Sequence, residues 1–338
     1  MRKATSSIPT VDVGGVATPR LILGHLPFVG ESYQGDARNA ALATTFAHVE
    51  NTIQVIARAM TTYGVTAMAV GAASESPLSR RLLDAVRAVR TRTRVELALI
   101  PCLRIPVTLD GEPIDDYRRW VTYYALERRL VEDDLLWRYC HDPILLCRPG
   151  WAERFPAAVT RLAPYSPDEL ARLHLDYEGL DAAVASFHED TVLLADVGSE
   201  SDFLAMAGRL DLLEAFTGSL RRALRCPVVL SLHHAGTSLP ILEASDLDVA
   251  GYVTPVNTLG ALMLPSPTRA VTAIQASRKP VIAIKPMAGG RIPPREAFDY
   301  VLREVGVAAT MIGVASAAEV DADLPPALNA LHGRRPTI

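Results

Sequence analysis

The stretch that decides the fold runs from Lys279 to Ser316 and reads KPVIAIKPMAGGRIPPREAFDYVLREVGVAATMIGVAS. An apolar run at 280–284 precedes a Gly-Gly turn. A helical segment then opens at Pro293 and Pro294, and a second apolar run covers 307–314. Apolar runs without polar alternation are typical of strands buried on both faces of a parallel sheet. The stretch therefore predicts a βαβ unit.

The same alternation of strand and helix extends toward the N-terminus. Together with the two strands above, six further runs bring the expected number to eight, at 21–26, 65–70, 94–103, 191–196, 227–232 and 248–254. Eight βα units predict an α/β fold, a single (β/α)8 TIM barrel that occupies residues 1–338.

The segment 105–190 interrupts this alternation because it is too long for one βα connection. It carries a helical pattern, many charges and all three Trp residues of the chain, so we expect a helical insertion. Large insertions after barrel strands lie on the catalytic face, where this one would form a lid. The alternative is an ordinary barrel helix with added decoration.

Composition excludes several classes of protein. The 338 residues are 49% hydrophobic and 21% charged, as in an ordinary globular protein, and the net charge is −4 without a Lys/Arg block. We therefore predict no nucleic-acid partner. No segment approaches the roughly 18 apolar residues of a membrane span, and the first nine residues do not resemble a signal peptide, so we expect a cytoplasmic protein. The four cysteines are interpreted as free thiols.

In a TIM barrel, the residues at the C-terminal ends of the strands carry the chemistry. Lys285 ends the run at 280–284, where an apolar rim would lower its pKa. It could form a Schiff base, act as a base or hold an anion. The alternative is a structural ion pair with Asp196 or Glu75.

Three histidines accompany this lysine at other strand ends. His25 and either His233 or His234 are expected to transfer protons, and Asp196 is expected to orient one of them. Neighbouring residues of a strand point to opposite faces, so His233 and His234 cannot both line the barrel unless the strand has ended. A divalent metal held by histidine and aspartate is the alternative. The residues expected to bind substrate are Tyr33, Glu75, Arg104, Asn257, Gly289, Gly290, Arg291 and Ser316.

Two parts of the chain resemble a known family. The segments KPMAGGRI (285–292) and MIGVASAAEVDADL (311–324) look like the last two βα units of the aldo/keto reductases. The segment VDVGGVATPRLILG (11–24) resembles the hairpin with which that family plugs the barrel before the first strand. The resemblance implies the same barrel and reduction of carbonyls with NADPH. It also implies Asp and Tyr after strand two, Lys after strand three and His after strand four.

This sequence departs from the family at all four catalytic positions. GAASES (71–76) stands where the Asp and Tyr belong, Arg104 stands in place of the Lys, and Asp196 in place of the His. Carbonyl reduction needs a positioned proton donor, and Tyr33 lies in a different loop. We therefore take the resemblance to predict the fold but not the activity.

The functional prediction follows from these residues. We expect a lyase or isomerase that acts on a small polar metabolite, carboxylated or phosphorylated, without a nicotinamide or other cofactor. The first alternative is an NAD(P)H-dependent reductase with a rearranged site, for which NADPH would be the cofactor. The second is a barrel without catalysis that serves as a binding or scaffold protein. No oligomeric state is predicted.

Overall fold

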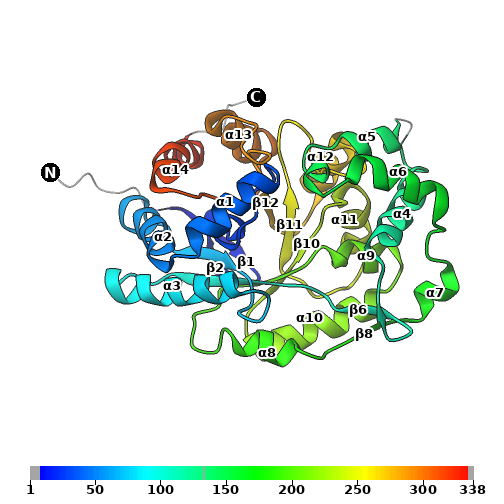
Figure 1. The fold of residues 1–338 in the computed structure, drawn as a ribbon, viewed down its shortest axis with the longest axis horizontal. Coiled ribbons are helices and arrows are strands. Elements are labelled where there is room, and N and C mark those ends of the chain that lie inside the picture. Colours follow the sequence, from blue (N-terminus) through cyan, green and yellow to red (C-terminus); the bar gives the residue numbers. More distant parts are fainter. Residues whose placement is uncertain (1–7, 132–133, 334–338) are drawn as a thin grey trace.

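Eight parallel strands form a closed barrel in the computed structural model, which describes residues 8–131 and 134–333 (Figure 1). The last strand pairs with the first through Thr310 and Leu21, Met311 and Ile22, and Ile312 and Leu23. The predicted (β/α)8 barrel is confirmed. Its strands in chain order are β3 (Leu21–Leu23), β4 (Ala67–Val70), β5 (Ala98–Leu103), β9 (Ala195–Val197), β10 (Val228–Ser231), β11 (Gly251–Pro255), β12 (Val281–Ile284) and β13 (Ala309–Ile312).

An antiparallel hairpin precedes the barrel, as expected from the resemblance. It consists of β1 (Thr10–Val13) and β2 (Val16–Pro19). Gly14 in its turn has a φ of 62°, and a Cβ there would lie 2.7 Å from the Cβ of Ala250. Only glycine permits this close approach without strain. Val13 is fully buried among the side chains that fill the barrel, so the hairpin closes one end of it.

Helices surround the strands and bury their apolar faces against them (Figure 1). Ser76 caps one of these helices by accepting a hydrogen bond from the N–H of Ser79, and Pro77 follows as the first helical residue. The helices outside the insertion are α1 (Asp36–Phe46), α2 (Val49–Tyr63), α3 (Pro77–Thr93), α9 (Glu200–Met206), α10 (Leu210–Leu224), α11 (Ala235–Glu243), α12 (Pro267–Ala276), α13 (Pro294–Asp299), the π-helix η3 (Tyr300–Val305) and α14 (Ala317–His332), with the 3-10 turn η1 (Leu26–Val29).

The long segment between β5 and β9 is mainly helical, but it also contains a small sheet that was not predicted. The sheet has the antiparallel order β7 (Glu112–Pro113), β6 (Val107–Leu109) and β8 (Leu173–Leu175). Strands of two or three residues are too short to show a period of two. The helices here are α4 (Asp116–Glu127), α5 (Leu135–His141), η2 (Leu145–Cys147), α6 (Trp151–Arg161), α7 (Pro167–Ala171) and α8 (Leu180–Ala185).

In the described residues, no helix is both long and apolar enough to cross a membrane. All four cysteines are free thiols, as expected.

Candidate active site

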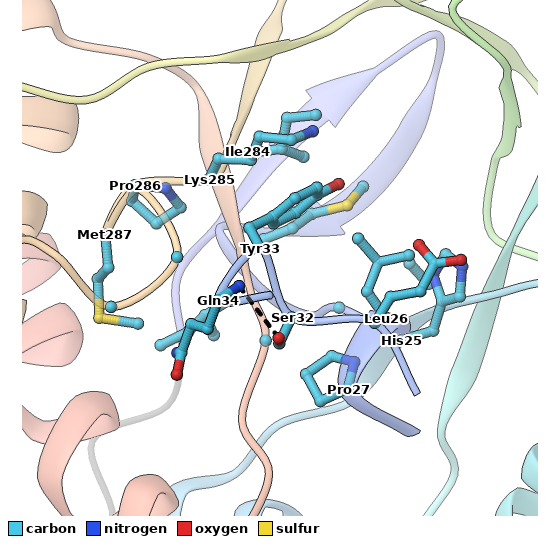
Figure 2. Close-up of a pocket in the computed structure, with 18 of the residues that line it drawn as sticks. His25, Leu26, Pro27, Ser32, Tyr33, Gln34, Ile284, Lys285, Pro286 and Met287 are labelled. Carbon is cyan, nitrogen blue, oxygen red and sulfur yellow. Dashed lines mark hydrogen bonds between the residues drawn. The ribbon is translucent and has the colours of Figure 1, made fainter. Parts of the chain in front are cut away.

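A cavity of about 840 Å³ opens at the C-terminal ends of the barrel strands (Figure 2). The part of the cavity nearest the barrel, called the strand end below, is formed by residues at the C-terminal ends of β5, β9, β10 and β12. Its helix end is formed by α1, α14 and the loop 289–294. The volume lies within the range of about 300–1,000 Å³ that small-molecule and cofactor sites occupy. This cavity, at the face where barrel enzymes place their chemistry, is the candidate active site.

Lys285 is the central charged group of the strand end. It follows β12 with a left-handed φ of 54°, and its Nζ lies 3.3 Å from Nε2 of His233. The same Nζ lies 5.0 Å from the ring centroid of Tyr33, and Figure 2 shows the two side chains side by side. Burial lowers the pKa of Lys285 to about 8, although the charges of Asp196 and Asp142 oppose the shift. The lysine is therefore mainly protonated at neutral pH but gives up its proton readily.

His233 accepts the hydrogen bond from this lysine. Burial, reinforced by the charge of Lys285, lowers the pKa of His233 well below its usual value, so the ring is neutral. The backbone N–H of His233 donates to Oδ2 of Asp202 at 2.6 Å. The Asp202 carboxylate is fully buried and thereby fixes the loop that carries the histidine. Asp202 lies in the short, buried helix α9, and no signal in the sequence distinguishes it.

Asp196 supplies the negative charge on the other side of the strand end. Its carboxylate accepts hydrogen bonds from Oγ of Ser231 at 2.8 Å and from Sγ of Cys102 at 3.4 Å. Burial raises the pKa of Asp196 to about 6, against the effect of these two donors and of the Lys285 charge. The group is thus ionised at neutral pH. Neither Ser231 nor Cys102 was predicted as a site residue.

His25 also lines the cavity, next to η1 (Figure 2). Burial lowers its pKa to about 4, so the ring remains neutral from mildly acidic to alkaline pH. The titration near an unperturbed pKa of about 6.5 that a proton-carrying histidine would show is therefore not expected for His25.

His234 is a correction to the predicted site, because it does not line the cavity. Its ring is buried beneath the insertion and contacts Tyr123. Nδ1 of His234 lies 3.0 Å from Oε1 of Glu127, which also accepts a hydrogen bond from Thr237. Burial alone would lower the pKa of His234, but the charge and hydrogen bond of Glu127 raise it above its usual value. The pair links the insertion to the barrel.

The structure brings five of the eight predicted substrate-binding residues to the cavity: Tyr33, Arg104, Gly289, Gly290 and Arg291. The other three, Asn257, Ser316 and Glu75, do not line the cavity, so their predicted role in binding substrate was wrong. Asn257 uses its amide to bond both backbone groups of Ala261. Ser316 accepts a hydrogen bond from the N–H of Glu319 and caps α14. Glu75 lies outside the lining, with its pKa raised by burial.

The loop after β12 offers free backbone donors to the cavity. Gly289 and Gly290 have φ values of 71° and 81°, and within residues 8–131 and 134–333 their N–H groups have no hydrogen-bond partner. Arg291 stabilises this loop by donating to the carbonyl oxygens of Tyr33 and Ala288, each at 2.8 Å. Consecutive N–H groups of this kind are suited to binding a phosphate.

The side chains considered as metal ligands do not converge. Across the described part of the chain, no group of three or more His, Cys, Asp or Glu side chains is placed to hold a metal ion. His25, Asp196 and His233 therefore do not make the metal site that was weighed as an alternative.

No protein-family model matches the sequence, and no curated protein is detectably similar to it. Solved structures do match. Two from Pseudomonas aeruginosa, assigned as aldo-keto reductases, have TM-scores of 0.52 and 0.51 at 15% identity. The matches cover 98% of this chain and 100% and 99% of theirs. An aldo/keto reductase from Brucella melitensis matches with a TM-score of 0.49 at 9% identity, over 97% of this chain and 94% of the other.

These comparisons contradict the prediction of a lyase or isomerase. The matching structures are assigned as aldo-keto reductases, which are oxidoreductases rather than lyases or isomerases. At this identity the likeness establishes architecture, and activity has to be argued from the site. The fold of this chain is that of the aldo-keto reductase structures it matches, and here it is a (β/α)8 barrel preceded by a β-hairpin.

Proposed function

We propose that this protein is an oxidoreductase that reduces the carbonyl group of a small molecule with a nicotinamide cofactor. One observation carries the proposal. A single cavity joins a buried, readily deprotonated lysine at the strand end to free backbone N–H groups in the loop after β12. The first feature suits proton transfer to a carbonyl oxygen, and the second suits a cofactor diphosphate.

The residues present fit such a cofactor. The N–H groups of Gly289 and Gly290 would bind its diphosphate, and the Arg291 guanidinium next to them adds positive charge. When bound, the nicotinamide supplies the hydride. The protein must then supply a proton donor, a binding site for the substrate and shielding from water.

Lys285 is the proton donor in this proposal. Hydride addition to the carbonyl carbon leaves negative charge on the oxygen, and Nζ of Lys285 transfers a proton to it, which leaves a neutral amine. The hydrogen bond to the neutral His233 directs Nζ, and the nearby Asp196 carboxylate favours the charged lysine. Lys285 would thus supply the proton from the C-terminal end of β12. Solvent protons restore the ammonium after product release.

Two arginines at the mouth of the cavity support an anionic group on the substrate. Arg104 and Arg119 both contact the same oxygen, Oε1 of Glu200, at 3.2 and 3.3 Å. The Arg104 side chain is 80% exposed, so most of its donors remain available. Arg119 comes from α4, so in this proposal the insertion contributes directly to substrate binding.

Cofactor binding is the primary test. Titration calorimetry should show saturable binding of NADH or NADPH at one site per chain, and absence of heat at millimolar concentrations of both would refute the proposed function.

Gly290→Ala should weaken cofactor binding at least tenfold, because the new Cβ would lie 3.1 Å from Nε2 of Gln34 at a φ of 81°. Gly179→Ala is the matched control: its φ is 82°, but no atom lies within 4 Å of the added Cβ, and the position is remote from the cavity.

The pH dependence of the reaction rate follows from the shifted pKa values of Asp196 and Lys285. With Lys285 protonated and Asp196 ionised in the active form, kcat/KM should fall below pH about 6 and above pH about 8, near the respective pKa values. Initial rates measured from pH 5 to 10 would show these two limbs. Asp196→Asn should remove the acidic limb and move the alkaline limb to lower pH, because the lysine loses a charge that favours its protonated form. A limb near 6.5 that disappears in His25→Gln would contradict this assignment.

A further inference from the structure

The helix end of the cavity carries two carboxylates from one face of α14. Glu319 and Asp323 are four residues apart and therefore lie one above the other along the helix, and both line the cavity. Arg38 of α1 lies opposite and contacts Oε1 of Glu319 at 3.0 Å. The second oxygen of Glu319 accepts a hydrogen bond from the N–H of Ala315, so this carboxylate occupies the N-terminus of α14.

Asp323 has no such partner. Throughout the described residues no ion pair or hydrogen bond reaches its carboxylate, although the residue is only partly exposed. Burial and the charge of Glu319 raise its pKa to about 6. It therefore remains ionised above neutral pH, and this end of the cavity carries an uncompensated negative charge.

The positions of Lys285 and of the Gly289 and Gly290 N–H groups determine which part of a bound cofactor would contact these carboxylates. The reacting ring of a nicotinamide cofactor has to lie near Lys285, and the diphosphate fits the N–H groups of Gly289 and Gly290. The adenosine half must then extend toward α14. Its ribose presents hydroxyl groups, which donate hydrogen bonds to carboxylates, whereas a phosphate on that ribose would meet two like charges.

We propose that Glu319 and Asp323 make this site selective for NADH against NADPH. The inference rests on the proposed function and specifies its cofactor. It differs from what the family resemblance implies, since the resemblance implies NADPH. Neighbouring cations offset the two carboxylates only in part: Arg38 pairs with Glu319 and leaves Asp323 without a partner, and Arg291 donates to backbone carbonyl oxygens of Tyr33, Ala288 and Pro143. The selectivity is therefore built by repulsion of the wrong cofactor as well as by binding of the right one.

Dissociation constants for NADH and NADPH, measured by titration calorimetry at pH 8, test the inference without requiring a substrate. The unaltered protein should bind NADH at least tenfold more tightly. Asp323→Asn should tighten NADPH binding about tenfold, because one like charge disappears and the shape is kept, and should leave NADH binding unchanged or slightly weaker. Asp321→Asn is the matched control on the same helix, since the Asp321 carboxylate binds Arg58 and Tyr63 outside the cavity.

The outcomes separate this inference from the proposed function. Equal or tighter binding of NADPH by the unaltered protein, or an Asp323→Asn variant with the same ratio of the two constants, would overturn the selectivity and leave the oxidoreductase proposal standing. Absence of binding by either dinucleotide would overturn both.

Discussion

Lys285→Ala is expected to lower kcat for carbonyl reduction by about 10²–10⁴-fold, the contribution typical of a positioned general acid. The variant keeps the backbone and the cavity but removes the proton donor. Lysine suits this role better than arginine, because a guanidinium does not release its proton in proteins. Only three of the chain's 34 Lys and Arg residues are lysines, and one of them lies at the centre of this site. Steady-state rates with saturating cofactor and substrate measure the effect.

Lys279→Ala is the matched control for this experiment. It removes the same atoms six residues earlier, where Nζ donates to the carbonyl oxygen of Leu247 outside the cavity. Its kcat should be unchanged. Calorimetric cofactor binding by Lys285→Ala should persist, which would show that the site is intact. A Lys285→Ala protein with near-normal kcat would remove Lys285 from the mechanism.

Glu127→Ala is expected to cost about 3–5 kcal/mol of unfolding free energy, because it leaves the buried His234 without its charged partner. Glu127 also accepts a hydrogen bond from Tyr139 at 2.5 Å, and that hydroxyl would lose its partner too. Both Glu127 and His234 are at most 1% exposed. Guanidinium denaturation followed by circular dichroism measures the change.

The pH dependence of this loss has a defined sign. The folded-state pKa of His234 lies above the unfolded value of about 6.5. Stabilisation by the pair is therefore complete below that value and is lost as pH rises through the folded-state pKa. The difference in unfolding free energy between the unaltered protein and Glu127→Ala should be largest near pH 6 and smaller at alkaline pH. Glu153→Ala, on the exposed face of α6, should change stability by no more than about 0.5 kcal/mol. A loss of similar size in both variants would contradict this role for the buried pair.

The barrel was predictable because its signals are local. The run at 281–284 is apolar without alternation, and Ser76 followed by Pro77 opens a helix, so each βα unit can be recognised from a few adjacent residues. The small sheet formed by β6, β7 and β8 escaped prediction because its strands are too short to show a period. The segment between β9 and β10 is divided into two helices, α9 and α10, and Gly208 with a φ of 71° lies between them.

The site was only partly predictable because its geometry depends on contacts between distant segments. Lys285 could be assigned to the cavity because it ends a strand. The neighbouring residues His233 and His234 could not be told apart, since the choice between cavity and core depends on where β10 ends and on Glu127 far away in the insertion. Asp202 contacts the backbone of His233 through tertiary structure alone, and no local pattern marks it.

The reaction class was mispredicted for a related reason. The absence of a side chain from one expected position does not establish the absence of the function that it would serve. A proton donor need only reach the reacting oxygen, and in a closed barrel several strand ends converge on that point. Lys285, which follows β12, lines the same cavity as Arg104 and Asp196.

The pairing of β13 with β3 has a consequence for synthesis of the chain on the ribosome. Residues 21–23 leave the ribosome long before their partners at 310–312. Throughout that interval the nascent barrel has two open sheet edges that can pair with other chains. The hydrogen-bonded ring can close only after residues 310–312 have emerged, so we expect chaperones that shield exposed strand edges to assist the nascent chain.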